Sequence, residues 1–117
     1  MQDGSSFQVA LTTSGPDCVL VSVAGELDLF TAPQLGSLLD RSIEQGATSV
    51  TVDLSEVTFL DAAALGVLVR AAQHFGSDSG TLPVICPDAR LRRLFEITGL
   101  DEMLTICASG EGALAAR

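Results

Sequence analysis

The spacing of the hydrophobic residues changes between residues 50 and 75, and this change restricts the folds open to the chain. A short β-branched run alternates apolar and polar side chains from Val50 and ends at Asp53, as is typical of a buried strand. From Leu65 onward the apolar residues recur at helical spacing, so an amphipathic helix is expected after the strand. The stripe expected to face the core consists of Leu65, Leu68, Val69, Ala72 and Phe75.

Asp61 stands just before this helix and is its predicted N-cap, because a carboxylate there can accept hydrogen bonds from unpaired backbone N–H groups. Gly66 lies inside the helix and destabilises it by about 1 kcal/mol relative to Ala, which suggests that another backbone approaches closely. That backbone belongs either to a docking partner or to a neighbouring loop of the same domain. The face opposite the core stripe, called the helix strip below, consists of Ala62, Ala63, Gly66, Arg70 and Gln73.

The other segments predict a β-hairpin followed by repeated α-β units. Thr31 is expected to cap the first helix, with Pro33 in its first turn, and Gly46 to end it. Asp88 and Gly99 are expected to bound a later helix. Because helices between strands require parallel pairing, the predicted fold class is α/β, with a mixed, mostly parallel sheet of about five strands and an N-terminal hairpin. The predicted strands are 7–11, 19–23, 50–53, 82–86 and 103–107, and a terminal helix is expected over 109–116.

The balance of charge argues against one class of function. The 117 residues include 15 acidic and 6 basic side chains, a net charge of −9, whereas binding to nucleic acid requires cations that neutralise phosphates. We therefore expect no direct contact with nucleic acid. The length suits a single domain over residues 1–117. Neither a membrane span nor a signal sequence is found, which predicts a cytoplasmic protein.

The three cysteines show no metal-binding spacing, so no metal site is predicted. Cys86 and Cys107 end two predicted strands that lie next to each other if the sheet follows the chain order. They form a redox-sensitive pair if their Cα atoms come within about 7 Å. The alternative is that both are buried, unpaired thiols of a reducing compartment.

Two aspartates, Asp28 and Asp61, follow strands and are expected at the same end of the sheet, where α/β folds often bind ligands. Paired carboxylates are compatible with acid–base catalysis. However, no nucleophile, arginine clamp or glycine-rich phosphate loop accompanies them. Capping and interface roles are therefore favoured, and the chain is predicted to be neither an enzyme nor a cofactor-binding protein.

Two segments, GELDLFTAPQL at 25–35 and DLSEVTFLDAAALGVLVRA at 53–71, resemble the STAS domain of bacterial anti-sigma factor antagonists. The resemblance extends over essentially the whole chain and implies the STAS fold. In the family, a Ser or Thr follows the capping aspartate and is phosphorylated by a partner kinase. Here that position is Ala62, followed by two further alanines, so the usual phosphoacceptor is missing.

The resemblance implies an anti-sigma factor antagonist, which binds an anti-sigma factor of the serine-kinase type and so frees a sigma factor for transcription. One alternative is a STAS scaffold subunit of a stress-signalling or lipid-transport assembly. Another is a domain that senses a small molecule or nucleotide. The sequence leaves the oligomeric state open. The residues expected to bind the partner are Asp28, Thr31, Asp61, Ala62, Ala63, Gly66 and Arg70.

Overall fold

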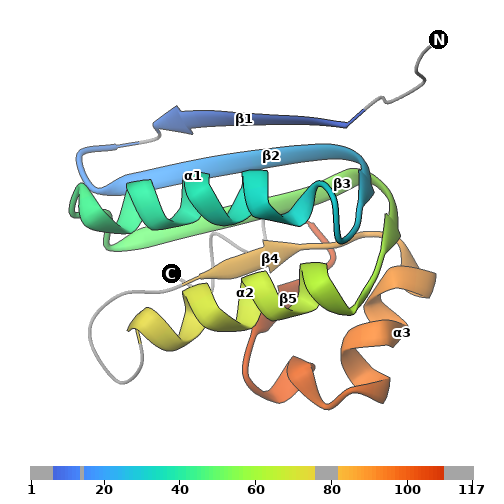
Figure 1. The fold of residues 1–117 in the computed structure, drawn as a ribbon. Helices are drawn as coiled ribbons and strands as arrows, with labels where there is room; N and C mark the ends of the chain where they lie inside the picture. Colours follow the sequence, from blue (N-terminus) through green and yellow to red (C-terminus); the bar gives the residue numbers. More distant parts are fainter. Residues whose placement is uncertain (1–6, 14, 76–81, 110–117) are drawn as a thin grey trace, which may run out of the picture.

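The computed structural model describes residues 7–13, 15–75 and 82–109 (Figure 1). Strands and helices alternate after an initial hairpin, as the sequence predicts. None of the helices within these residues is long and apolar enough to cross a membrane. The elements are β1 (Gln8–Thr13), β2 (Cys18–Leu27), α1 (Ala32–Glu44), β3 (Ser49–Leu60), α2 (Ala62–Phe75), β4 (Pro83–Ile85), α3 (Ala89–Ile97), a 3-10 turn (Leu100–Glu102) and β5 (Thr105–Cys107).

The strands form one mixed sheet in the order β1-β2-β3-β4-β5. β1 pairs antiparallel with β2, and the other neighbouring strands are parallel. In Figure 1 both α1 and α2 lie in front of the sheet, whereas α3 lies beyond the end of β4. The predicted α/β class, with an N-terminal hairpin and a mostly parallel five-stranded sheet, is confirmed.

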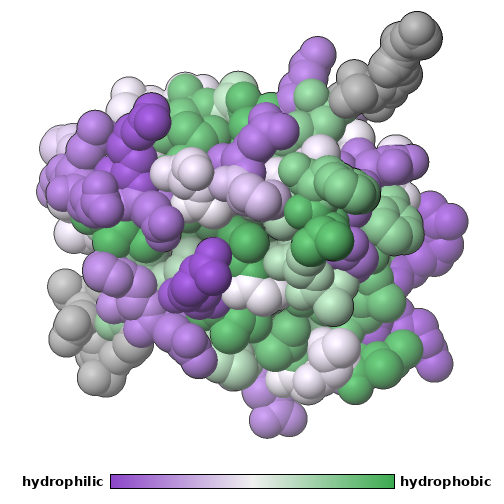
Figure 2. Space-filling model, in the orientation of Figure 1, coloured by the Kyte–Doolittle hydropathy of each residue, from purple (hydrophilic) through white to green (hydrophobic). Residues whose placement is uncertain are grey.

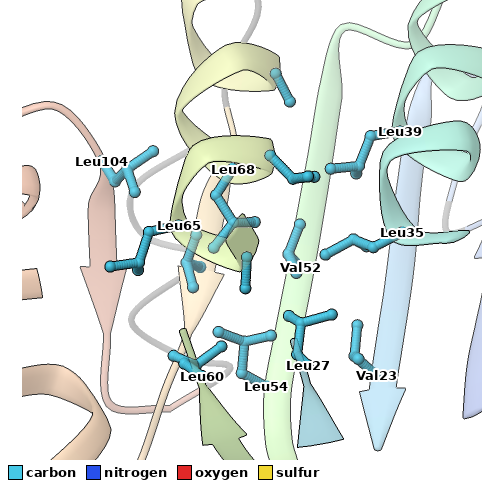
Figure 3. Close-up of a cluster of buried hydrophobic side chains, with 14 of the residues drawn as sticks. Val23, Leu27, Leu35, Leu39, Val52, Leu54, Leu60, Leu65, Leu68 and Leu104 are labelled. Carbon is cyan, nitrogen blue, oxygen red and sulfur yellow. The ribbon is translucent and has the colours of Figure 1, made fainter. Parts of the chain in front are cut away.

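The hydrophobic core fills the space between the sheet and these two helices. Val52 in β3, Leu39 in α1 and Leu68 in α2 are completely buried. Figure 3 shows side chains from all three elements pointing toward one another. The burial of these large aliphatic groups stabilises the arrangement, at about 1.5–3 kcal/mol for each side chain.

Two strands are longer than the sequence predicts. β3 does not end at Asp53 but continues to Leu60, and β2 runs past Gly25 to Leu27. The β2–β3 register shifts between Ser22 and Ala24 and again between Gly25 and Glu26. Such irregularities break the alternation of buried and exposed residues without ending the strand. The prediction was wrong because it took Asp53 and the Ala24-Gly25 pair as the ends of these strands, whereas the pairing of β2 with β3 continues beyond both.

The core-facing side of α2 is also rotated relative to the prediction. Leu65, Leu68 and Phe75 are buried as expected, but Val69 and Ala72 are only half-buried. Alanines and Val67 are buried in their place, because small side chains let this helix lie close to the sheet. The buried residues of α2 are Ala64, Leu65, Val67, Leu68, Ala71 and Phe75.

The ends of the other helices agree with the sequence. Gly46 and Gly99 follow α1 and α3 with φ of 95° and 77°, a backbone conformation that favours glycine. The Asp88 side chain accepts a hydrogen bond from the Arg90 backbone N–H at 2.8 Å and caps α3. β5 is shorter than predicted because Met103 and Leu104 close the preceding 3-10 turn, where their backbone N–H groups donate to the Leu100 carbonyl at 3.0 and 2.8 Å. The predicted terminal helix falls largely on residues 110–117, which lie outside the described residues.

Gly36 sits at the contact between α1 and α2. A Cβ atom added there would lie 3.6 Å from Cγ1 of Val67, an ordinary van der Waals distance. Gly36→Ala should therefore fit and, through its better helix propensity, raise the free energy of unfolding by about 0.5–1 kcal/mol. Gly36→Leu should lower it by about 1–3 kcal/mol through overpacking. Urea denaturation measures both effects, and a destabilised Gly36→Ala variant would contradict this view of the contact.

Candidate protein-interaction surface

The Asp61 carboxylate joins two segments that are far apart in the sequence. Its Oδ1 accepts a hydrogen bond from the Ala64 backbone N–H at 3.1 Å, which caps α2 as predicted. Its Oδ2 accepts another from the Leu29 backbone N–H at 3.0 Å. Because Leu29 belongs to the loop between β2 and α1, this second bond fixes that loop against the start of α2. Asp28 and Asp61 thus follow strands at the same end of the sheet, as expected.

Asp28 and Thr31 hold the same loop from within. Oδ1 of Asp28 accepts hydrogen bonds from the backbone N–H groups of Phe30 and Thr31, at 2.9 and 3.1 Å. Oγ1 of Thr31 accepts one from the Asp28 backbone N–H and donates one to the Glu26 carbonyl, both at 2.8 Å. The predicted capping of α1 by the Thr31 side chain is wrong, because its hydroxyl turns back toward the strand.

These bonds leave large apolar side chains at the surface. Leu29 is 66% exposed and Phe30 is 84% exposed, and Phe59, near the end of β3, is 47% exposed. Phe59 lies opposite Glu26 in the β2–β3 register, so it belongs to the same end of the sheet. Figure 2 shows hydrophobic surface gathered at this end. Phe59 points to the opposite face of the sheet from the buried Leu60 next to it, so we limit the name apolar end patch to Leu29 and Phe30, two adjacent exposed apolar residues of the kind that mark interaction sites.

The apolar end patch was missed by the sequence analysis. A signal was present in residues 25–35, where an apolar pair lies between Asp28 and Thr31, two residues that favour loops. Their exposure depends on the hydrogen bond to Asp61, however, which lies 32 residues away from Leu29.

The helix strip begins beside this patch. Ala62, Gly66, Arg70 and Gln73 are exposed, and Ala63 is half-buried. A Cβ atom added to Gly66 would meet no heavy atom within 4 Å among the described residues. No neighbouring loop in this part of the chain therefore requires a glycine here. Of the two explanations for Gly66, the open space favours a docking partner.

Arg70 is a cation on this otherwise neutral strip. Its guanidinium Nη2 lies 3.7 Å from the position that a Cβ would take on Gly36, which places it beside α1. Within the described part of the chain, Arg70 forms no ion pair. The chain has only 6 basic residues against 15 acidic ones, so an exposed cation without a carboxylate partner is available to an acidic group of another molecule.

The two carboxylates are arranged for structure and not for proton transfer. Both Asp28 and Asp61 accept hydrogen bonds from backbone N–H groups, which gives each carboxylate a structural function. In the ranges that the structure covers, no group of three or more His, Cys, Asp or Glu side chains could hold a metal ion. The arrangement therefore suits recognition of a surface.

The predicted redox pair receives no support from the geometry. The backbone N–H of Cys86 donates to the Cys107 carbonyl at 2.7 Å, so the two residues are neighbours. However, Cys86 belongs to the main core, whereas Cys107 packs with Ile85 in a separate cluster. Because successive residues of a strand face opposite sides, the two thiols point to opposite faces of the sheet. Burial also raises the pKa of the Cys86 thiol, which disfavours the reactive thiolate.

Comparison with known proteins agrees with the resemblance seen in the sequence. A family model described as the STAS domain matches residues 10–113. The chain is 36% identical over 96 residues to the anti-sigma-B factor antagonist of Bacillus subtilis (strain 168), covering 82% of this chain and 87% of that protein. The matching family consists of non-enzymatic regulators, which agrees with the prediction that the chain is not an enzyme.

Solved structures give the same result for the fold. The crystal structure of an anti-sigma factor antagonist from Mycobacterium paratuberculosis is similar with a TM-score of 0.82 and 26% identity, covering 99% of this chain and 97% of that one. A sulfate transporter family protein from Wolinella succinogenes reaches a TM-score of 0.74 at 18% identity, covering 90% and 88%. At that identity the second similarity supports the fold alone.

The two hydrogen bonds of Asp61 can be separated by mutation. Asp61→Ala removes both, so it should lower the free energy of unfolding by about 1 kcal/mol through the lost cap and also release the Leu29 loop. Asp61→Asn keeps one carbonyl oxygen and should be less destabilised, because it retains one of the two acceptors. Urea denaturation measures stability, and hydrogen exchange at the Leu29 amide reports on the loop. A fully stable Asp61→Ala variant with unchanged Leu29 exchange would refute this function of Asp61.

Proposed function

This chain belongs to the STAS domain family of anti-sigma factor antagonists, and from that premise we propose that it binds an anti-sigma factor of the serine-kinase type and so frees a sigma factor for transcription. The observation that supports this most is the open helix strip over Gly66 beside the apolar end patch. A glycine that destabilises its own helix and meets nothing in the described fold is explained by close approach of a partner backbone.

The apolar end patch supplies the affinity in this proposal. Phe30 and Leu29 are largely exposed in the free protein, and burying a side chain of this size stabilises a complex by about 1.5–3 kcal/mol. A few such residues usually dominate a protein interface. Their loop is already held by Asp61 and Asp28, so little conformational freedom remains to be lost on binding.

Arg70 supplies specificity. The proposed partner places a carboxylate against its guanidinium, which has no ion pair in the described part of the chain. Such a pair at the rim of an interface mainly affects recognition and the association rate, and salt weakens it. Asp28, Thr31 and Asp61 act indirectly, because their polar groups are occupied in holding the loop.

Ala62 makes the proposed complex insensitive to the usual switch. It is exposed at the first position of α2, immediately after Asp61, and carries a methyl group instead of a hydroxyl. Phosphorylation would place about 1.5–2 negative charges there at neutral pH. Without an acceptor oxygen the surface stays neutral at this position. We therefore propose a cytoplasmic antagonist that is not switched off by phosphorylation at position 62.

The two alternatives receive less support. A scaffold subunit in a stress-signalling or transport assembly would use the same surface, but the similarity to a transporter-family protein concerns the fold alone. A sensor of small molecules or nucleotides was expected to bind near Asp28 and Asp61. A surface cavity lies elsewhere, between α3 and β5, and its lining includes Arg92 and Asp101 but neither of those aspartates.

Calorimetric titration with a kinase-type anti-sigma factor from the same organism tests the proposal. Gly66→Arg should abolish binding, because a long charged side chain would hold the two surfaces apart. Gly66→Ala is the matched control: it should stabilise the free protein by about 0.5–1 kcal/mol and weaken binding much less. Absence of binding by the wild-type protein would refute the function, whereas equal affinity of Gly66→Arg would place the interface elsewhere.

The second test concerns position 62. With ATP and the cognate kinase, the wild-type protein should acquire no phosphate at the start of α2, and Ala62→Ser should restore an acceptor there. Ala62→Asp should weaken binding, because an unpaired carboxylate is costly to desolvate against an apolar or acidic partner surface. Mass spectrometry locates any phosphate, and calorimetry measures the affinity. If Ala62→Asp binds as tightly as the wild type, the helix start lies outside the interface.

A further inference from the structure

β1 forms one outer edge of the sheet. It pairs with β2 on one side, and no other described strand lies on its second side (Figure 1). Five of its six residues are exposed, and Val9 is half-buried. In an edge strand of this kind, every second residue directs its backbone N–H and C=O groups away from the sheet. This edge is therefore able to accept another strand.

The usual features that protect an edge strand are missing from β1. Proteins commonly use charged side chains, proline or a β-bulge at such edges. The sequence of β1, QVALTT, contains neither charge nor proline. Its pairing with β2 runs without a shift from Gln8 opposite Ala24 to Thr13 opposite Val19, and the register shifts fall between β2 and β3 instead. The strand is thus regular and uncharged along its whole length.

From this edge we propose that β1 pairs antiparallel with β1 of a second copy of the chain, which joins two five-stranded sheets around a two-fold axis. Leu11 lies opposite the buried Val21, so its side chain is on the helix-covered face, where it is still 40% exposed. An axis through Leu11 brings the two Leu11 side chains together. The pairing therefore satisfies backbone groups and covers apolar surface with the same residues from both copies.

Electrostatic repulsion between two copies of the chain is weaker at this edge than at most other surfaces. Each chain carries a net charge of −9, so two copies repel one another. Residues 4–16, which include all of β1, contain no charged side chain. This segment lets two copies approach with the least repulsion, and added salt should strengthen the association because it screens the remaining charge.

The pairing is weak and leaves the proposed docking surface free. Two six-residue strands bury less area than the roughly 1,200–2,000 Å² of a stable interface, so the dimer forms reversibly and depends on concentration. The β1–β2 pairing stops at Ala24, before the loop that carries Leu29 and Phe30. Dimerisation is therefore independent of the proposed function, and each copy can present its own docking surface.

Sedimentation velocity of the full chain, from micromolar to millimolar concentration, tests the proposal. The wild-type protein should shift from monomer to dimer as concentration rises. Ala10→Lys should raise the dimer dissociation constant roughly tenfold, because the two lysines would lie diagonally across the axis, where like charges repel. Ala108→Lys is the matched control. It introduces the same charge at another exposed alanine beyond β5, at the far edge of the sheet, and should dimerise as the wild type does.

Amide hydrogen exchange of the wild-type protein gives a second test that requires no variant. Exchange in residues 8–13 should slow as concentration rises, whereas exchange in β5 should not. A wild-type protein that stays monomeric at millimolar concentration would overturn the proposal, as would an Ala10→Lys variant that dimerises normally. Protection at Leu29 and Phe30 in place of β1 would assign self-association to the apolar end patch. Gly66→Arg should dimerise like the wild type, which separates this test from that of the proposed function.

Discussion

The surface described here depends on one carboxylate that serves two segments. Asp61 caps α2 through Oδ1 and binds the Leu29 backbone through Oδ2, so a single side chain fixes the start of a helix and a loop 32 residues earlier. Because both acceptor oxygens are used, the relative position of the apolar end patch and the helix strip is set before any partner arrives. Asp28 and Thr31 complete the arrangement through hydrogen bonds within the same loop.

This rigidity explains how an acidic protein keeps an apolar surface exposed. Leu29 and Phe30 cannot fold back onto the core while the backbone amides of their loop are bonded to Asp61 and Asp28. The exposed apolar area reduces the stability of the isolated chain, and Gly66 adds a helix penalty of about 1 kcal/mol. The exposed apolar side chains and Gly66 lie on adjoining elements and both reduce stability. One shared interface explains both features more readily than two unrelated causes would. Local rules of stability are most often broken where a protein functions.

The sequence predicts those features that depend on neighbouring residues. The caps by Asp61 and Asp88 and the helix end at Gly46 rest on a few adjacent positions, and the structure confirms them. The full length of β3 was missed because its register with β2 shifts, and a shift is a property of two strands. The exposure of Phe30 was missed for a similar reason, since it depends on a hydrogen bond between distant segments. For Thr31 the sequence predicted a feature that is absent. Threonine is suited to capping a helix, but the Thr31 hydroxyl instead donates to the Glu26 carbonyl in the preceding segment.

The alanine at position 62, where the proposed function places the missing phosphoacceptor, changes what can control the proposed complex. An exposed methyl group at the start of α2 adds no charge and needs no hydrogen-bond partner, so the proposed docking surface has a single charge state at this position. A switch that works by phosphorylation at position 62 would require a hydroxyl group there, and alanine has none. Control of the complex then rests with the amount of this protein, with the partner, or with features away from α2. The β1 edge is one such feature, because the pairing that we propose there would depend on concentration and would leave the helix strip and the apolar end patch accessible in each copy.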